Sequence, residues 1–194
     1  MTKKPPFRKL RGYAFDPSLS LKMDTALINE ITYKVPWEDG PVDLQPGPIG
    51  EYLEVVDYDP TVEKLYAPVD LDSKYVLAQD GVAPSASNPQ FHQQMVYAVA
   101  MTTIKNFETG LGRPVLWSPH TTVVDKPVSQ KKKKKADEEL IPAKKLETEF
   151  VQRLRIYPHA LRDANAFYSP QKKALLFGYF AARPADITLQ MPDN

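Results

Sequence analysis

One segment, residues 88–112, restricts the fold of this 194-residue chain more than any other. It opens with Asn88, a favourable N-cap residue, which is followed by a proline, and it closes with two glycines that can stop a helix. Between these ends the stretch MVYAVAM, residues 95–101, is apolar almost all the way round a helix. We therefore predict a long helix over about 89–109 that is buried on several sides and forms the centre of the core.

The sequence before this helix has mainly strand character. Nineteen prolines against eight glycines favour stiff, extended connections over further long helices. We expect a basic, mobile arm over residues 1–10 and a β-rich region over residues 11–87. Five short stretches within it are predicted as strands: residues 12–20, broken at Asp16-Pro17, and residues 30–37, 51–58, 64–69 and 75–78.

Residues 88–194 are predicted to form an α/β lobe that contains the long helix. Strand-like alternation returns at residues 149–157 and 174–180. Residues 118–148 are expected to be an insertion, because five consecutive lysines, Lys131–Lys135, are followed by acidic residues, as in a solvated or disordered tract. The predicted fold class is α+β, with a twisted, mostly antiparallel sheet packed on the helix.

Composition excludes several classes of function. Twenty-five basic and 24 acidic residues give a net charge of +1, which provides no overall field to attract nucleic acid or an anionic membrane. The absence of cysteine excludes disulfides and thiolate chemistry. No apolar run reaches the roughly 18 residues that span a bilayer, and the basic start lacks the apolar stretch of a secretory signal. These features indicate a cytoplasmic protein.

The three histidines do not form a recognisable catalytic motif. His92, His120 and His159 show no H-E-x-x-H spacing, and no phosphate-binding glycine loop is present. His92 can be a ligand or base near the helix start, or a polar residue at the helix edge. His159 can have a functional role, or be a turn residue bonded to the backbone. Both stay as weak candidates, and the lysine run lacks the interleaved aromatic residues that stack on bases.

The ordered segments NPQFHQQMVYAVAM, IYPHALRDANAFY and ALLFGYF carry a family resemblance. A long buried helix, a strand, an Asn-Ala-aromatic-aromatic turn and a second strand follow in that order. The order resembles the N-terminal lobe of thermolysin-like zinc metallopeptidases, the gluzincins. The chain is also similar to a group of uncharacterised bacterial gluzincin-like proteins in the segments DPSL, PGPIGEYLEVVDYDP and YAPVDLD. The resemblance covers most of the chain outside the lysine-rich insertion.

The resemblance implies a peptide-binding role for the turn at residues 165–168. It assigns Asn165 and Ala166 to contacts with the backbone of an extended substrate, and Phe167 and Tyr168 to the cleft wall or to packing. The chemistry of the residues agrees, because an asparagine carboxamide offers a donor and an acceptor side by side, and an extended peptide can add to a sheet edge. The alternative is that Asn165 only shapes a hairpin and the aromatic residues fill the core.

The chain departs from the family in its catalytic half. Zinc peptidase chemistry needs two histidines one helical turn apart, a further ligand and a glutamate base, and none of these sets is present. The chain ends about where the zinc-binding helix of the family would begin. We therefore expect the N-terminal portion of a metallopeptidase, not catalytic by itself, that supplies one wall of a peptide cleft. Zinc is expected only in a longer parent protein.

Other interpretations stay open from the sequence. The chain can be a non-enzymatic binding or assembly protein that holds a partner on its sheet edge or helix face. A weaker alternative is binding of nucleic acid or an acidic surface through Lys131–Lys135. The expected partners are an extended peptide or protein, and a missing C-terminal catalytic domain or a second copy, because a lobe without its other half exposes apolar surface.

Overall fold

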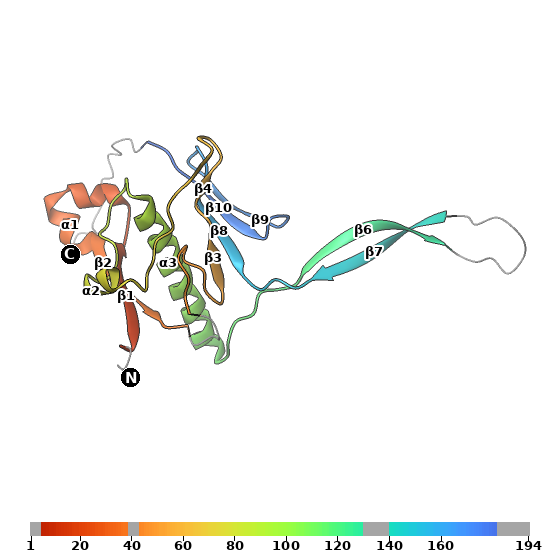
Figure 1. Cartoon of the computed structure of the whole chain (residues 1–194), viewed down its shortest axis with the longest axis horizontal. Helices are drawn as coiled ribbons and strands as arrows, with labels where there is room; N and C mark the ends of the chain where they lie inside the picture. The colour runs from red at the N-terminus through yellow and green to blue at the C-terminus, as the bar shows by residue number, and fades with distance from the viewer. Residues whose placement is uncertain (1–4, 39–42, 130–139, 182–194) are drawn as a thin grey trace, which may run out of the picture.

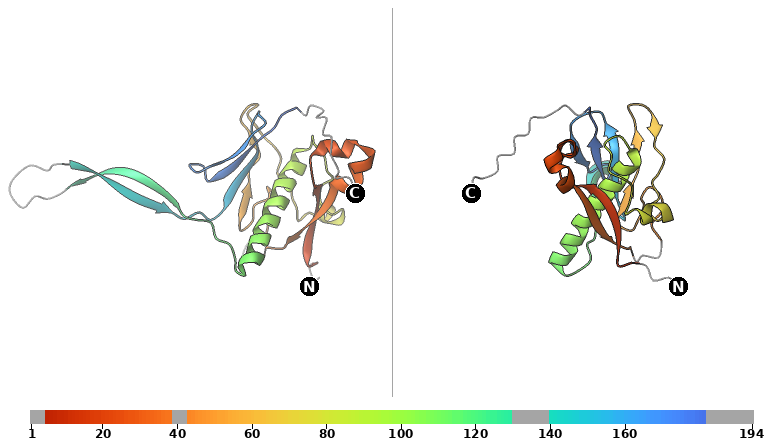
Figure 2. Two further views of the ribbon diagram at one scale, coloured as in Figure 1. Left: turned by 180° about the vertical axis from the view of Figure 1, so that it is seen from behind. Right: turned by 90° about the vertical axis from the view of Figure 1, so that its left-hand side faces the viewer.

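A computed structural model of the chain describes residues 5–38, 43–129 and 140–181. The fold is mixed α+β, as predicted, and the long helix α3 (Pro89–Leu111) lies between two layers of strands (Figures 1 and 2). One layer is a ribbon of β1 (Phe7–Tyr13) and β2 (Glu30–Pro36). The other is a four-stranded sheet. The predicted helix is therefore central to the core.

Helix α3 begins and ends where its sequence signals place it. The Asn88 side chain accepts a hydrogen bond from the Gln90 backbone N–H at 3.0 Å, and a proline occupies the first turn. Gly112 ends the helix in the left-handed conformation with φ of 64°. Gly110, expected to contribute to the stop, instead lies within the last helical turn.

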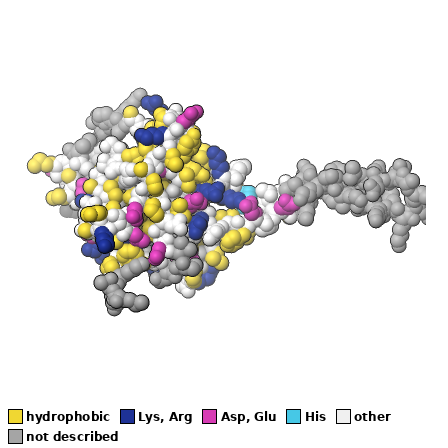
Figure 3. Space-filling model, in the orientation of Figure 1, with side chains coloured by type: hydrophobic (Ala, Val, Ile, Leu, Met, Phe, Trp, Pro, Cys, Tyr) yellow, Lys and Arg dark blue, Asp and Glu magenta, His cyan; other side chains and the backbone are white. Residues whose placement is uncertain are grey.

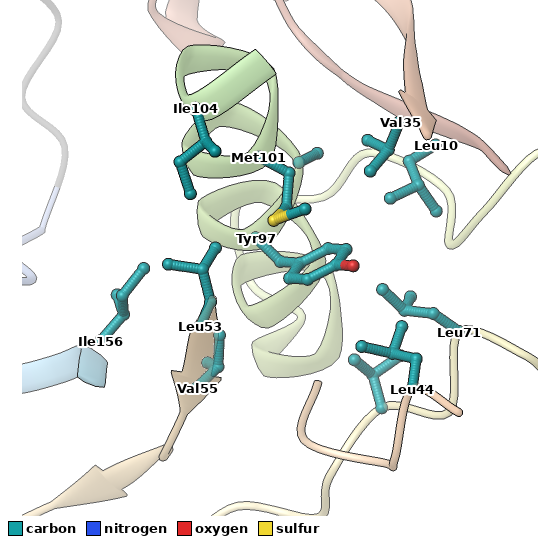
Figure 4. Packing of buried hydrophobic residues seen from close by; sticks show 12 residues of the cluster. Leu10, Val35, Leu44, Leu53, Val55, Leu71, Tyr97, Met101, Ile104 and Ile156 are labelled. Carbon is teal, nitrogen blue, oxygen red and sulfur yellow. The ribbon is translucent and has the colours of Figure 1, made fainter. Parts of the chain in front are cut away.

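Tyr97 occupies the middle of the core and packs toward both strand layers (Figure 4). Its hydroxyl donates to Glu38 Oε1 at 2.7 Å, so the one polar atom of this buried ring is paired. Burial, together with the Glu38 carboxylate, raises the pKa of the Tyr97 hydroxyl and keeps it neutral. The apolar residues around it come from every layer: Leu10, Val35, Leu44, Leu53, Val55, Leu71, Met101, Ile104 and Ile156.

The expectation of a mobile arm over residues 1–10 is wrong for Phe7 to Leu10, which belong to β1. Alternate side chains of this strand, those of Arg8 and Leu10, are buried against α3 and its surroundings. The Arg8 guanidinium pairs with Asp72 and lies 4.3 Å from the centre of the Trp37 ring. Basic residues that make such contacts belong to the fold and not to a free arm.

The strands β1 and β2 are joined by two helical segments, so the prediction of a broken strand over residues 12–20 is wrong beyond Tyr13. These are the 3-10 helix η1 (Pro17–Leu21) and the helix α1 (Met23–Asn29). Asp16 caps η1, since its side chain accepts from the Ser18 backbone N–H at 2.7 Å. The predicted strand at residues 30–37 is confirmed as β2.

The main sheet is mixed, so the prediction of a mostly antiparallel sheet is wrong. Its strands lie in the order β3 (Leu53–Val55), β8 (Leu154–Leu161), β10 (Ala174–Gly178) and β9 (Ala166–Ser169). Only the β9 and β10 pair is antiparallel. The chain reverses after β8 and again after β9, and β10 then lies between those two strands. Two reversals make β10 parallel to β8.

Four of the predicted strands have different boundaries or a different structure, and the one at 64–69 is a strand only at Lys64–Leu65. Residues 51–58 divide between β3 and β4 (Tyr58–Asp59), and β4 pairs with β5 (Lys64–Leu65). Residues 75–78 belong to the short helix α2 (Lys74–Ala78). The predicted strand at 149–157 is interrupted, because Glu149 ends β7 through its pairing with His120 and β8 begins only at Leu154.

The flanks of the predicted insertion form a long two-stranded ribbon that projects from the body (Figure 1). Strand β6 (His120–Ser129) pairs with β7 (Leu140–Glu149) over their whole lengths. The prediction of a solvated or disordered tract over 118–148 is therefore wrong for residues 120–129 and 140–149, which pair as strands. Lys131–Lys135 lie outside the described residues. None of the helices in the described ranges has the length and apolar character needed to cross a membrane.

Candidate functional site

Strand β9 lies at one edge of the main sheet and carries most of the predicted substrate-binding residues. Asn165 lies in the turn that leads into the strand, and its side chain is exposed. Ala166, Phe167 and Tyr168 follow within β9. Among the described residues β9 pairs only with β10, so its outer edge is open (Figure 1). The predicted turn therefore meets an unpaired strand edge.

The hydrogen bonding of the ladder shows which main-chain groups face outward. The Gly178 backbone N–H donates to the Asn165 carbonyl at 2.7 Å, so Asn165 is directed toward β10. Residues alternate along an antiparallel pair between those that bond to the partner and those that do not. The N–H and C=O groups of Ala166 and Tyr168 therefore point away from β10, toward the open edge.

Gly178 sets the position of the turn before β9. A Cβ atom on Gly178 would fall well inside the contact distance of the Asp163 carbonyl oxygen, and 2.8 Å from the Asn165 carbonyl oxygen. The absence of a side chain lets the backbone of residues 163–165 pass directly over β10. Sequence reasoning did not single out Gly178, because the close approach arises from the fold and not from a local motif.

The two aromatic residues of β9 lie on opposite faces of the sheet. Tyr168 is opposite Leu175, and Phe167 is opposite Leu176, so each shares a face with its cross-strand partner. Phe167 is 46% exposed and Tyr168 is 51% exposed. Neither ring is buried in the core, and both flank the open edge where a bound strand would lie.

An apolar groove of about 420 Å³ runs between α3 and the main sheet. Its presence corrects the prediction that α3 is buried on several sides, since Val99 on this side is 41% exposed. Exposed hydrophobic side chains also occupy much of the compact body seen in Figure 3. All of the groove's lining residues are apolar except Thr103: Leu53, Met95, Val96, Val99, Ala100, Ile104, Trp117, Leu154, Ile156, Leu175 and Phe177.

The fold brings the two weak candidates, His92 on α3 and His159 on β8, into direct contact. His92 Nδ1 lies 2.8 Å from His159 Nε2, and His159 Nδ1 lies 2.6 Å from Asp57 Oδ1. Gln93 donates to Asp57 Oδ2 at 2.8 Å. Asp57, Gln93 and His159 are all buried, and His92 is partly exposed. Three segments distant in sequence therefore share one polar chain.

Aromatic rings surround His159 and exclude water from the middle of this chain. The Tyr66 ring centre lies 5.1 Å from that of His159, and the Tyr179 ring centre lies 5.4 Å away. Burial lowers the pKa of His92, and the charge of His159 acts in the same direction. Asp57 and the backbone of Ala86 and Ser85 act in the opposite direction. No spacing in the sequence indicated that the two histidines would meet.

His120, the third histidine, lies on β6 and is absent from this chain of hydrogen bonds. Across residues 5–38, 43–129 and 140–181, no group of three His, Cys, Asp or Glu side chains is arranged to hold a metal ion. The two candidate sites are therefore the open edge of β9 and the buried chain from Asp57 to His92.

Comparisons of the chain with protein-family models, with curated proteins and with solved structures gave no match.

Proposed function

We propose that this chain is the N-terminal portion of a zinc metallopeptidase, not catalytic by itself, and that it supplies one wall of a cleft for extended peptides. The observation that carries the proposal is the open edge of β9, which begins beside the exposed side chain of Asn165. The described residues do not provide a ligand set for zinc, so no chemical step on the metal is assigned to them.

Recognition at this edge is a matter of main-chain pairing. An extended peptide laid along β9 can exchange hydrogen bonds with the outward N–H and C=O groups of Ala166 and Tyr168. The Asn165 carboxamide, with one acceptor and two donors, can pair with the peptide backbone beyond the end of the strand. Such contacts do not depend on the peptide's side chains, so binding is expected to be broad in sequence.

The apolar groove supports the same proposal. Four strands span about 15 Å at the usual spacing, whereas one helix with its side chains is about 10 Å wide. Helix α3 contacts β3 and β8, and the groove extends over Leu175 and Phe177 of β10. A further apolar element of a longer parent protein would cover this part of the sheet.

Replacing Asn165 by alanine should weaken binding of an extended peptide without unfolding the chain. The side chain is exposed, so its loss removes contacts to the ligand and few within the protein. We expect a loss of about 1 kcal/mol, or roughly fivefold in dissociation constant, as for one to two hydrogen bonds. The measurement is an NMR titration of the labelled chain with a short apolar peptide, which follows the amide signals of Ala166 and Tyr168.

Two controls make this test specific. Asn106→Ala removes an exposed asparagine from α3, away from the edge, and should leave the affinity unchanged. A peptide methylated on alternate backbone nitrogens keeps its side chains but cannot pair with β9, and should not bind. If the methylated peptide binds as well as the unmodified one, or the shifts map away from β9, recognition by this edge is disproved.

A second candidate function is non-enzymatic assembly, and the groove is the observation that favours it. Under this alternative the chain binds a second copy of itself. Two copies related by a two-fold axis can each cover the other's apolar groove between α3 and the main sheet. We expect concentration-dependent dimers in sedimentation equilibrium, and monomers when Val99 is replaced by aspartate. Leu27→Asp, at a 90% exposed position on α1, should leave the dimer intact. A wild-type chain that stays monomeric at all concentrations would exclude this alternative.

A further inference from the structure

We infer that the face of the main sheet that points away from α3 binds a free nucleotide, a ligand that joins a flat aromatic base to a phosphate group. The inference goes beyond the peptide-binding proposal and does not depend on it. It rests on a second pocket, of about 500 Å³, in which tyrosine rings and basic side chains meet. The lining residues that carry the argument are Tyr58, Tyr157, Leu176, Arg155, Lys172 and Lys173.

Strand alternation places this pocket on the side of the sheet opposite the apolar groove. Ile156 of β8 lines the groove, so its two neighbours, Arg155 and Tyr157, point to the other side. Leu176 of β10 is paired with Tyr157 and lies on the same side. Tyr58 comes from β4, which contacts β8, so a segment distant in sequence adds a second tyrosine to the lining.

The two tyrosines offer aromatic surface to a ligand. Tyr58 is 42% exposed, and Tyr157 is partly buried. Within the ranges that the structure describes, neither ring is in contact with another aromatic ring, so neither is already stacked. A planar base stacks on such rings whatever its identity. The aromatic part of the ligand is therefore expected at Tyr58 and Tyr157.

Three basic side chains of the same pocket are suited to a phosphate. Arg155, Lys172 and Lys173 line it, and none of its described lining residues is acidic. Glu54 accepts from Arg155 Nε at 3.1 Å, which leaves the two Nη groups of the guanidinium outside that bond. Lys172 forms no ion pair with any described residue. Both side chains can therefore form charge-assisted hydrogen bonds to a phosphate.

The third cation, Lys173, fixes where the pocket lies in the molecule. It pairs with Glu149, the last residue of β7, so the basic side chains lie at the base of the projecting ribbon. Figure 3 shows a group of Lys and Arg side chains on the body at this place. The ion pair partly neutralises Lys173, so Arg155 and Lys172 are the main phosphate ligands of the proposal.

The charge of the whole chain favours a small anion over a polyanion. Binding of single-stranded nucleic acid depends on a positively charged groove that follows many phosphates. The net charge of +1 provides no such field, and the excess of positive charge here is confined to one pocket. A volume of about 500 Å³ falls within the usual range of small-molecule sites. The ligand is therefore a nucleotide that is not part of a nucleic acid.

The test on the wild-type chain is an NMR titration with adenosine monophosphate, which should shift the backbone amides of Tyr157 and Lys172. Adenosine lacks the phosphate and inorganic phosphate lacks the base, so each should bind at least about tenfold more weakly. Inorganic phosphate that binds as tightly as the nucleotide would overturn the inference, since the pocket would then be a non-selective anion patch. A short single-stranded oligonucleotide that binds more tightly at equal nucleotide concentration would overturn the assignment to a free nucleotide.

Two exposed side chains provide the variants. Tyr58→Ala should weaken binding of adenosine monophosphate by roughly fivefold or more through lost stacking, and Tyr58→Phe should keep it. Lys172→Ala should weaken it by roughly five- to tenfold through one lost charge-assisted contact. The matched controls are Tyr75→Ala, at an 86% exposed position on α2, and Lys34→Ala, at an exposed position on β2, which should both bind as the wild type does. Wild-type affinity in Tyr58→Ala and Lys172→Ala would overturn the inference.

Discussion

Replacing Gly178 by alanine is expected to destabilise the chain by about 2–3 kcal/mol, in the upper part of the range for overpacking, because the neighbours are rigid backbone atoms. The added methyl group would collide with the carbonyl oxygens of Asp163 and Asn165. Both are backbone atoms in a short turn, so they cannot move aside by a change of side-chain rotamer. The turn must shift away from β10, and the hydrogen bond from Gly178 N–H to the Asn165 carbonyl is lost.

The same shift should impair peptide binding, because it moves Asn165 and changes which main-chain groups of β9 face outward. Urea unfolding measures the stability, and the NMR titration with an extended peptide measures the binding. Gly178→Ala should lose affinity beyond the effect of Asn165→Ala, since it displaces the whole start of β9. A variant with wild-type stability would show that the turn does not lie against Gly178.

Gly110→Ala is the matched control. A Cβ atom at Gly110 meets no atom within 4 Å, and the residue lies in the last turn of α3. Alanine there should stabilise the chain by about 0.5–1 kcal/mol, since glycine is the poorer helix former. Two glycine-to-alanine changes of opposite sign would separate the steric collision from any general effect of losing a glycine.

Local signals in the sequence predicted the long helix well. Asn88, Pro89 and the apolar run act within one or two turns of chain, so their meaning does not depend on distant contacts. The apolar run also predicted more burial than α3 has, and the difference is the open groove beside Val99. The excess of apolar character over observed burial is a reason to expect another element or a second copy at this surface.

Pairing between distant segments could not be predicted in the same way. The parallel pairing of β10 with β8 depends on which strand of the β9 and β10 hairpin lies next to β8, and no local signal in the hairpin specifies that strand. His92 and His159 are 67 positions apart and meet only because α3 crosses the end of β8. The Asn165 turn was predicted from its residue types, whereas its place at an open edge is a product of the fold.

Replacing Gln93 by leucine should have the largest effect of the substitutions considered, a loss of about 3–5 kcal/mol. Gln93 is fully buried on α3, and its amide oxygen accepts from the Val69 backbone N–H at 2.8 Å. Its amide nitrogen donates to Asp57 Oδ2 at 2.8 Å and to the Ala67 carbonyl at 3.1 Å. Leucine leaves the buried Val69 N–H and the buried Asp57 Oδ2 without this partner, at about 1–3 kcal/mol for the N–H and more for the carboxylate oxygen, and its own burial offsets part of the sum. The exposed Ala67 carbonyl still accepts from Gln90.

The unpaired Asp57 oxygen is the more costly of the two buried groups, because a buried carboxylate depends on its donors. Urea unfolding at neutral pH measures the loss, and Gln90→Leu is the control. Gln90 lies one turn earlier on α3, is only partly buried, and makes one hydrogen bond of 3.2 Å to the Ala67 carbonyl. A small change is expected there. If Gln93→Leu cost no more than Gln90→Leu, the buried polar chain around Asp57 would contribute little to stability.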